Sequence, residues 1–157
     1  MTEERQKLVS ELERILNQYS FGSELITFSD QTDQDLEKLK QGQLINLPNM
    51  FSNPCKIQEC HAMSAYLWML DPSIQIYNGF ALIEEEIVNS SWYHHSFVVK
   101  DNIILEPTTL KRDKYFGIPL SPSETQTFVL GELTNIHRFA DEFNICREFL
   151  SSFLIKD

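Results

Sequence analysis

The fold of this chain is decided by the stretch WYHHSFVVKDNIILE, which spans residues 92–106. Aromatic and β-branched residues on both sides of Lys100-Asp101-Asn102 are typical of two β-strands joined by a turn. If Asp101 and Asn102 form a two-residue turn, Lys100 pairs with Ile103. The stretch therefore predicts a β-hairpin whose register is set by that turn.

The first 59 residues favour two helices followed by a loop. Apolar residues recur at helical spacing over 8–19, and Gly22 is expected to end this helix. A shorter helix is predicted from Thr32, which would cap it, to about Gln41. Residues 43–59 contain two prolines and several Asn and Ser residues, a composition typical of a loop.

The rest of the chain alternates between helical and strand-like patterns. A short apolar helix is predicted from Cys60 to about Leu70, because Asp71-Pro72 would terminate it. A strand-like run over 74–84 precedes the hairpin. After the hairpin the sequence predicts an irregular stretch, a strand and a long amphipathic helix, over residues 107–125, 126–130 and 134–154.

The order of helices, then strands, then a helix indicates an α+β fold with an antiparallel sheet. A length of 157 residues suits a single domain, and no repeat or change of composition divides it. We expect a core over about residues 43–130, flanked by helical segments at 1–42 and 131–157.

Composition excludes several classes of function. The 13 Lys and Arg residues against 23 Asp and Glu give a net charge of -10, which disfavours binding to nucleic acid or to an anionic membrane. No secretory signal and no apolar run long enough to span a membrane is present. Three cysteines cannot complete a disulfide framework. We expect a soluble, cytoplasmic protein, although export without a classical signal would leave no trace in the sequence.

Three residues in order along the chain suggest nucleophilic chemistry. Cys60 begins the predicted apolar helix, where the helix dipole and unpaired N–H groups stabilise a thiolate. His95 lies in the first strand of the hairpin, and Glu106 ends the second. An imidazole beside a thiol acts as its base, and a carboxylate on the other ring nitrogen orients the imidazole.

The hairpin register links the carboxylate to one of two adjacent histidines. With a two-residue turn, Phe97 pairs with Glu106, and Glu106 then lies on the face of His95 as its diagonal neighbour. A three-residue turn would move Glu106 to the opposite face. His94 and His95 point to opposite faces of one strand, so His95 is the one that fits Glu106.

Four short motifs in this order resemble the transglutaminase-like core of the papain-like cysteine enzymes. They read Glu59-Cys60-His61-Ala62, Tyr77-Asn78-Gly79-Phe80-Ala81, His95-Ser96-Phe97-Val98-Val99 and Glu106-Pro107-Thr108. The resemblance covers about residues 58–108, a third of the chain. It implies a papain-like fold, with a central helix packed on the sheet. Glu106 stands where the family usually has Asp, and Phe97 where it usually has Trp.

The resemblance also implies a function. Cys60, His95 and Glu106 would form the catalytic triad of a hydrolase or acyl transferase (a peptidase, deamidase or transglutaminase-like enzyme) that passes through a thioester and needs no cofactor. A protein or peptide is the expected substrate. Gln58, Trp92 and Asn78 are candidates for an oxyanion donor or a wall of the substrate site, although no motif singles out any of them.

Two other functions compete for the same residues. A binding module could keep this fold without turnover and use its flanking helical segments to dock a partner. A zinc site could use Cys55, Cys60 and the histidines at 61, 94 and 95, but Cys-x4-Cys-His is not a strong zinc spacing. Of the other thiols, Cys146 lies in a predicted apolar stripe and Cys55 in a predicted loop, so a structural and a bystander role are expected.

Overall fold

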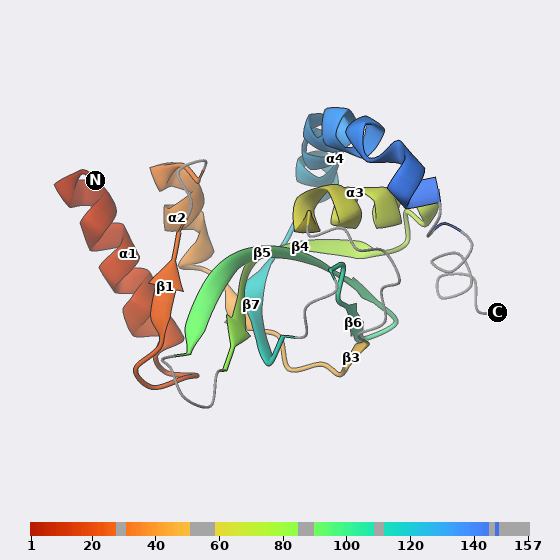
Figure 1. Cartoon of the computed structure of the whole chain (residues 1–157). Helices are drawn as coiled ribbons and strands as arrows, with labels where there is room; N and C mark the ends of the chain where they lie inside the picture. Colours follow the sequence, from red (N-terminus) through yellow and green to blue (C-terminus); the bar gives the residue numbers. More distant parts are fainter. Residues whose placement is uncertain (28–30, 51–58, 85–89, 109–111, 145–146, 148–157) are drawn as a thin grey trace. The chain divides into compact units, whose positions relative to one another are not determined.

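The computed structural model of the chain (Figure 1) describes residues 1–27, 31–50, 59–84, 90–108, 112–144 and 147. The chain divides into two compact units, each assembled from three separate segments. Unit 1 contains Met1–Asn46, Asn78–His95 and Arg112–Ile118, and unit 2 contains Leu47–Tyr77, Ser96–Lys111 and Pro119–Asp157. This division cuts across the predicted boundaries between a core and its flanking helices.

Unit 1 has two helices and parts of several strands. Its elements are α1 (Glu3–Leu16), β1 (Glu24–Ile26), α2 (Asp33–Leu39), β2 (Gln43–Leu44), most of β7 (Lys114–Pro119) and portions of β4 (Gln75–Ile83) and β5 (Ser91–Lys100). Both helices bury their apolar sides in one cluster with the strands. That cluster contains Leu8, Leu12, Leu16, Leu25, Leu36, Leu39, Phe80, Leu82, Trp92 and Phe116.

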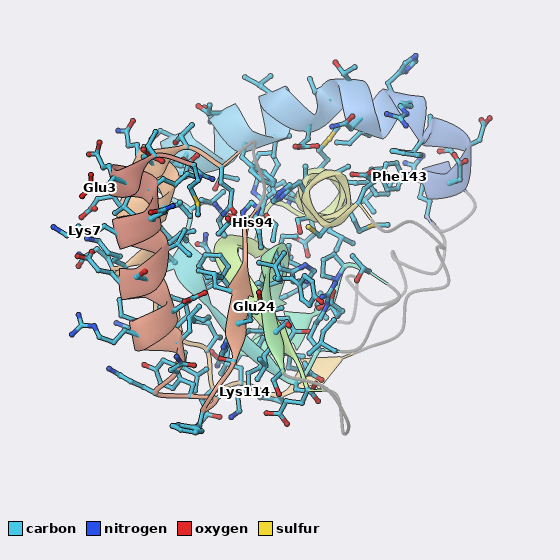
Figure 2. All side chains as sticks on the ribbon, turned by 60° about the vertical axis from the view of Figure 1, so that its left-hand side comes forward. Glu3, Lys7, Glu24, His94, Lys114 and Phe143 are labelled. Atoms are coloured by element: carbon cyan, nitrogen blue, oxygen red, sulfur yellow. The ribbon has the colours of Figure 1, made fainter. Side chains whose placement is uncertain are left out.

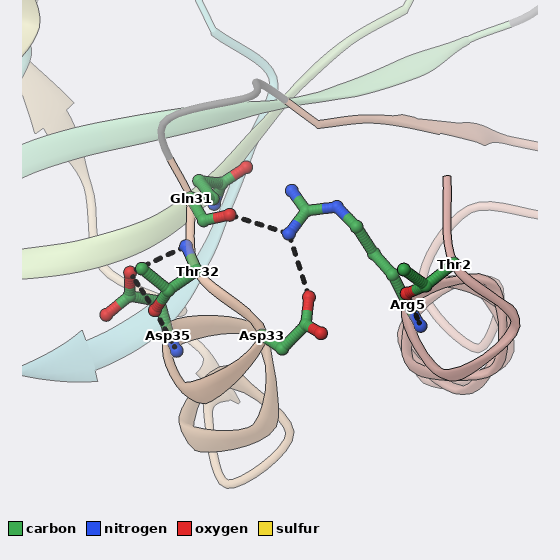
Figure 3. A network of polar contacts seen from close by, with 6 residues as sticks. All are labelled: Thr2, Arg5, Gln31, Thr32, Asp33 and Asp35. Carbon is green, nitrogen blue, oxygen red and sulfur yellow. Dashed lines mark hydrogen bonds and ion pairs between the residues drawn. The ribbon is translucent and has the colours of Figure 1, made fainter.

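Polar side chains fix the starts of the two helices of unit 1. Thr32 and Asp35 form a reciprocal capping box at α2, which confirms the predicted cap. Arg5 of α1 donates from Nη1 to the Gln31 carbonyl oxygen at 2.7 Å and to Asp33 at 3.0 Å, so α1 is bonded to the start of α2 (Figure 3). Glu3 and Lys7 lie one turn apart on the exposed side of α1 (Figure 2).

The strand pairs of unit 1 are both parallel and antiparallel. β1 pairs with β5 in parallel, and β2 pairs with β7 antiparallel. Gly79 of β4 lies against β7, because a Cβ built at this position would be 1.9 Å from the Phe116 carbonyl oxygen. Only a residue without a side chain allows the two backbones to approach so closely.

Unit 2 packs helices and strands around a second apolar cluster. Its further elements are β3 (Asn49–Met50), α3 (Cys60–Leu70), β6 (Ile103–Leu105) and α4 (Pro122–Arg138), with α3 and α4 side by side (Figure 1). The buried residues of this apolar cluster are Ala62, Met63, Ala65, Leu67, Ile74, Ile76, Val98, Val129 and Phe143. The predicted bounds of α3 are confirmed, and so is its burial on several sides.

The predicted hairpin is present with the predicted turn. Lys100 pairs with Ile103 and Val98 with Leu105, so Asp101 and Asn102 form a two-residue turn. Both turn residues have positive φ, 51° and 59°, as a type I′ turn requires. This confirms the register on which the assignment of Glu106 to the face of Phe97 depends.

The α+β class is confirmed, while several sequence predictions need correction. The sheet is mixed, because β1–β5 and also β3–β6 are parallel pairs. The strand predicted over 126–130 is wrong, since these residues lie within α4. The irregular stretch predicted over 107–125 contains β7 and the start of α4. The first helix ends at Leu16, well before the predicted stop.

The long terminal helix predicted from Thr134 differs at its start. α4 begins at Pro122, where Ser121 and Glu124 form a capping box, and it ends at Arg138. Residues 140–144 are again helical, after a turn at Phe139. Among the helices that the structure describes, none is both long and apolar enough to cross a bilayer.

Candidate functional site

Cys60 is the first residue of α3 and is half-buried. The residue before it, Glu59, makes no side-chain hydrogen bond to the helix end. The backbone N–H groups of a first helical turn have no partner within the helix, so they can donate to a negative group there. Cys60 therefore has the position predicted for a nucleophile.

The contact between α3 and the hairpin is made on one face of β5. His61 Nδ1 is hydrogen-bonded to Ser96 Oγ, which is fully buried. Val98, two residues further along β5, packs in the apolar cluster that includes four residues of α3. Residues two apart share a face of a strand, so α3 packs against the face of Ser96 and Val98.

Glu106 is a buried carboxylate directly after β6. Its residue is 5% exposed, and its Oε1 accepts hydrogen bonds from the Thr108 hydroxyl at 2.9 Å and the Thr108 N–H at 3.3 Å. The last pair of the hairpin is Val98–Leu105, and the same register extended by one residue beyond β6 would put Glu106 opposite Phe97. Phe97 alternates with Ser96 and Val98 along β5, and it stacks on Tyr77 at 5.3 Å between ring centroids. Glu106 is thus assigned to the face of the hairpin opposite α3.

His95 is a buried imidazole within β5. It is 1% exposed, and the centre of its ring lies 6.3 Å from that of Tyr115. Burial holds an imidazole in a fixed orientation, as a catalytic base requires. Buried histidines also occur as core residues without a catalytic role. His95 belongs to unit 1, whereas Cys60 and Glu106 belong to unit 2. The triad as a whole stays a prediction.

The three candidates for an oxyanion donor or a substrate wall have different surroundings. Trp92 is fully buried, and its indole N–H donates to Ser23 Oγ at 3.0 Å. Asn78 Oδ1 lies 3.0 Å from His94 Nε2. Gln58 lies outside the described residues, as do Cys55 and Cys146. The two described candidates thus each make a hydrogen bond to another side chain.

The sequence analysis predicts none of three polar features that the structure shows in this region. The His61–Ser96 bond joins two residues that lie 35 apart in the chain. The His94–Asn78 bond connects neighbouring strands. Ser64 is fully buried in α3, and among the residues that the structure describes its hydroxyl has no hydrogen-bond partner. A signal existed only for Ser64, because a polar residue within the otherwise apolar run 62–70 is unusual.

The structure does not support a zinc site in the part of the chain that it describes. Within it, no group of three or more His, Cys, Asp or Glu side chains could hold a metal ion. His61 is bonded to Ser96, and His94 to Asn78. Two of the histidines that were candidates for zinc ligands are thus hydrogen-bonded to other side chains.

Compared with protein-family models, with curated proteins and with solved structures, the chain matches none.

Proposed function

We propose that this protein is a cysteine-dependent hydrolase or acyl transferase that uses Cys60 as nucleophile, His95 as base and Glu106 to orient His95. The observation that carries the proposal is the two-residue turn of the hairpin. Its register supports the assignment of Glu106 to the face of β5 that carries Phe97. His95 lies two residues before Phe97 on this strand and therefore shares that face. The position of Cys60 at the start of α3 adds further support.

The proposed reaction proceeds in two steps. The Cys60 sulfur bonds to the carbonyl carbon of an amide or ester, and His95 receives the thiol proton. The carbon–nitrogen or carbon–oxygen bond then breaks, and His95 returns the proton to the leaving group. Water or an amine next attacks the thioester, which releases Cys60 and gives hydrolysis or transfer. A protein or peptide that supplies the acyl group is the proposed substrate.

A binding module without turnover is the second candidate, and a specific observation favours it. α3 contacts the hairpin on the face of Ser96 and Val98, whereas the register assigns Glu106 to the opposite face. In addition, Trp92 and Asn78 each make a hydrogen bond within the protein. On this alternative, His95 and Glu106 are buried polar residues that serve the fold.

Selective labelling separates the two candidates. Iodoacetamide is added to the folded protein below pH 7, and mass spectrometry follows each of the three thiols. The enzyme proposal expects Cys60 to react much faster than Cys55 and Cys146. Equal labelling of all three thiols would reject it. Reaction with p-nitrophenyl acetate provides a second test, because an acetyl group should accumulate on Cys60. The His95→Gln variant should release this acetyl group from Cys60 more slowly than the unchanged protein.

Matched variants complete the test. Glu106→Gln keeps the size of the side chain and removes its charge, so acetylation of Cys60 should slow while the fold is retained. Asp101→Asn changes the charge at the exposed turn and serves as the control. If Cys60→Ala leaves the biological activity intact, the binding module is the correct function.

A further inference from the structure

The outward side of α4 exposes two leucines and no formal charge. Leu130 is 68% exposed and Leu133 is 40% exposed. The exposed residues of α4 before Arg138 are Pro122, Ser123, Gln126, Thr127, Leu130, Gly131, Leu133, Thr134 and His137. In contrast, the charged residues that α1 exposes are Glu3, Glu4, Lys7 and Arg14. Depletion of charge is typical of the centre of a protein interface, so this face of α4 has the composition of a contact surface.

The exposed residues of α4 have the spacing of a seam between two helices. Ser123, Gln126, Leu130, Leu133 and His137 follow one another at intervals of three, four, three and four residues. This alternation keeps one side of a helix against a neighbouring helix. The seam is also symmetric about a point between the two leucines, because one polar residue lies four positions before them and another lies four positions after. A contact between identical copies requires such self-complementarity.

Gly131 leaves room beside the two leucines. A Cβ built on this glycine meets no atom within 4 Å, and its φ is not positive. Nothing in the described part of the chain therefore requires a glycine here, although glycine destabilises the interior of a helix relative to alanine. Thr127, Leu130, Gly131 and Thr134 lie on two adjacent turns, as do the four residues that form a hole for a side chain of a facing helix. The absent side chain widens this hole enough for a leucine.

We propose that α4 binds a second copy of this chain, and that the two α4 helices pair antiparallel about a twofold axis between Leu130 and Leu133. In this arrangement, Leu130 of each copy faces Leu133 of the other. Gln126 of each copy faces His137 of the other, so polar residues lie at both ends of the apolar centre. The proposal concerns the surface of α4 alone and does not depend on the proposed catalytic function.

Charge favours a second copy in this direction. Two chains with a net charge of -10 repel each other, so they can meet only where neither presents like charges to the other. α4 has Glu124 in its first turn and Arg138 in its last. Antiparallel pairing brings the acidic start of each helix to the basic end of the other, whereas parallel pairing would bring like charges together. Glu124 accepts a hydrogen bond from the Ser121 N–H, and a carboxylate has room for further donors.

The size of the surface sets the expected strength. α4 has 17 residues, so it is about 25 Å long. A contact made by one such helix and its copy is at the lower end of specific interfaces, where association is weak and reversible. We expect a dissociation constant of about 1–100 µM. The protein should therefore be monomeric when dilute and dimeric when concentrated.

Sedimentation equilibrium of the full chain, from about 1 µM to about 500 µM, measures this association. Leu130→Glu places a negative charge beside the axis and should raise the dissociation constant at least tenfold. Phe21→Ser removes a fully exposed aromatic ring from unit 1 and should leave the constant unchanged. Both positions are exposed, and circular dichroism checks that the variants are folded. A chain that stays monomeric throughout leaves this face to another partner and overturns the inference, as does equal dimerisation of Leu130→Glu.

Cysteine cross-linking tests the direction of the pairing. Gln126→Cys and His137→Cys are mixed and exposed to air, and peptide mass mapping identifies each disulfide, including any from the native thiols. The antiparallel dimer should join position 126 of one copy to position 137 of the other. Each variant alone should form no bond between its introduced cysteines, since the two copies of one position lie about 16 Å apart along the helices and a disulfide spans less than about 7 Å. The reverse pattern would indicate parallel helices and overturn the inference.

Discussion

Lys100, the last residue of β5, forms an ion pair with Asp71, the C-cap of α3, at 2.5 Å between Nζ and Oδ2. Both side chains are 19% exposed. Asp71 Oδ1 also accepts hydrogen bonds from the N–H and the hydroxyl of Ser73. The pair therefore connects the turn end of the hairpin to the end of α3 within unit 2.

Asp71→Asn should lower the stability and reduce its dependence on pH. The Lys100 ammonium, followed by Ser73, holds the pKa of Asp71 below its ordinary value of 3.8. A carboxyl with a lowered folded pKa stabilises the fold above its unfolded pKa, and this contribution is lost as the pH falls through the folded pKa. Urea unfolding at pH 7 should show a loss of about 1 kcal/mol, which disappears well below about pH 4.

A double-mutant cycle with Lys100→Gln measures the pair itself. The coupling free energy between Asp71 and Lys100 should be about 0.2–1 kcal/mol, as for a partly exposed pair. Asp141→Asn, at an exposed position, is the control and should leave the pH dependence unchanged. A coupling of zero would show that the ion pair does not contribute.

Asn102→Gly should stabilise the hairpin turn. Asn102 has φ of 59°, a conformation that glycine adopts without steric cost. Glycine at the second position of a type I′ turn is strongly preferred. Thermal unfolding should show a gain of up to about 1 kcal/mol. Asn102→Ala, in contrast, should destabilise the protein, and a change of the same sign in both variants would contradict the assigned turn.

Gly79→Ala should strongly destabilise unit 1. The added Cβ would lie 1.9 Å from the Phe116 carbonyl oxygen and 2.5 Å from the Gly117 Cα, so the two strands would have to separate. We expect a loss of more than about 3 kcal/mol, or aggregation on expression. Gly131→Ala is the matched control, because a Cβ there meets no atom within 4 Å. In helix α4 this substitution should raise the free energy of unfolding by about 1 kcal/mol.

Ser121→Ala should weaken the start of α4. Ser121 accepts a hydrogen bond from the Glu124 N–H, and the Glu124 carboxylate accepts one from the Ser121 N–H. Loss of a serine cap costs about 1 kcal/mol, which chemical denaturation can resolve. Thr127→Ala, on the exposed side of the same helix, removes a hydroxyl that has no capping role. Equal losses in both variants would show that the capping box is not important.

Strong local signals explain which elements the sequence predicted. Thr32 with Asp35 makes a capping box, and Asp71-Pro72 ends α3 by restricting the backbone. The Asp101-Asn102 turn fixes its register through two residues alone. Each of these signals acts within a few residues, so no knowledge of the remaining fold is needed to read it.

The elements that the sequence analysis did not predict depend on distant partners or on the capping signal at the start of α4. β1 has three residues and forms only through pairing with β5, more than 60 residues later. The strand predicted over 126–130 includes Phe128 and Val129, which have high β propensity. The capping box Ser121–Glu124 and Pro122 start a helix there instead, and they were available as a signal.

For the candidate site, the sequence predicted the helix start at Cys60 and the hairpin register. It could not predict which face of β5 would receive α3. That choice depends on how side chains such as Val98 and Met63 pack, and on the His61–Ser96 bond. Strand alternation specifies two faces but does not say which one a helix will cover.

The assembly of unit 1 from three separate segments affects its synthesis on the ribosome. α1 and α2 leave the exit tunnel long before Phe80, Trp92 and Phe116, which bury their apolar sides, have been translated. Domains fold as units during synthesis, so the leucines of these two helices stay exposed until translation has passed β7. Nascent chains that end before this strand should therefore be the ones that chaperones bind most strongly.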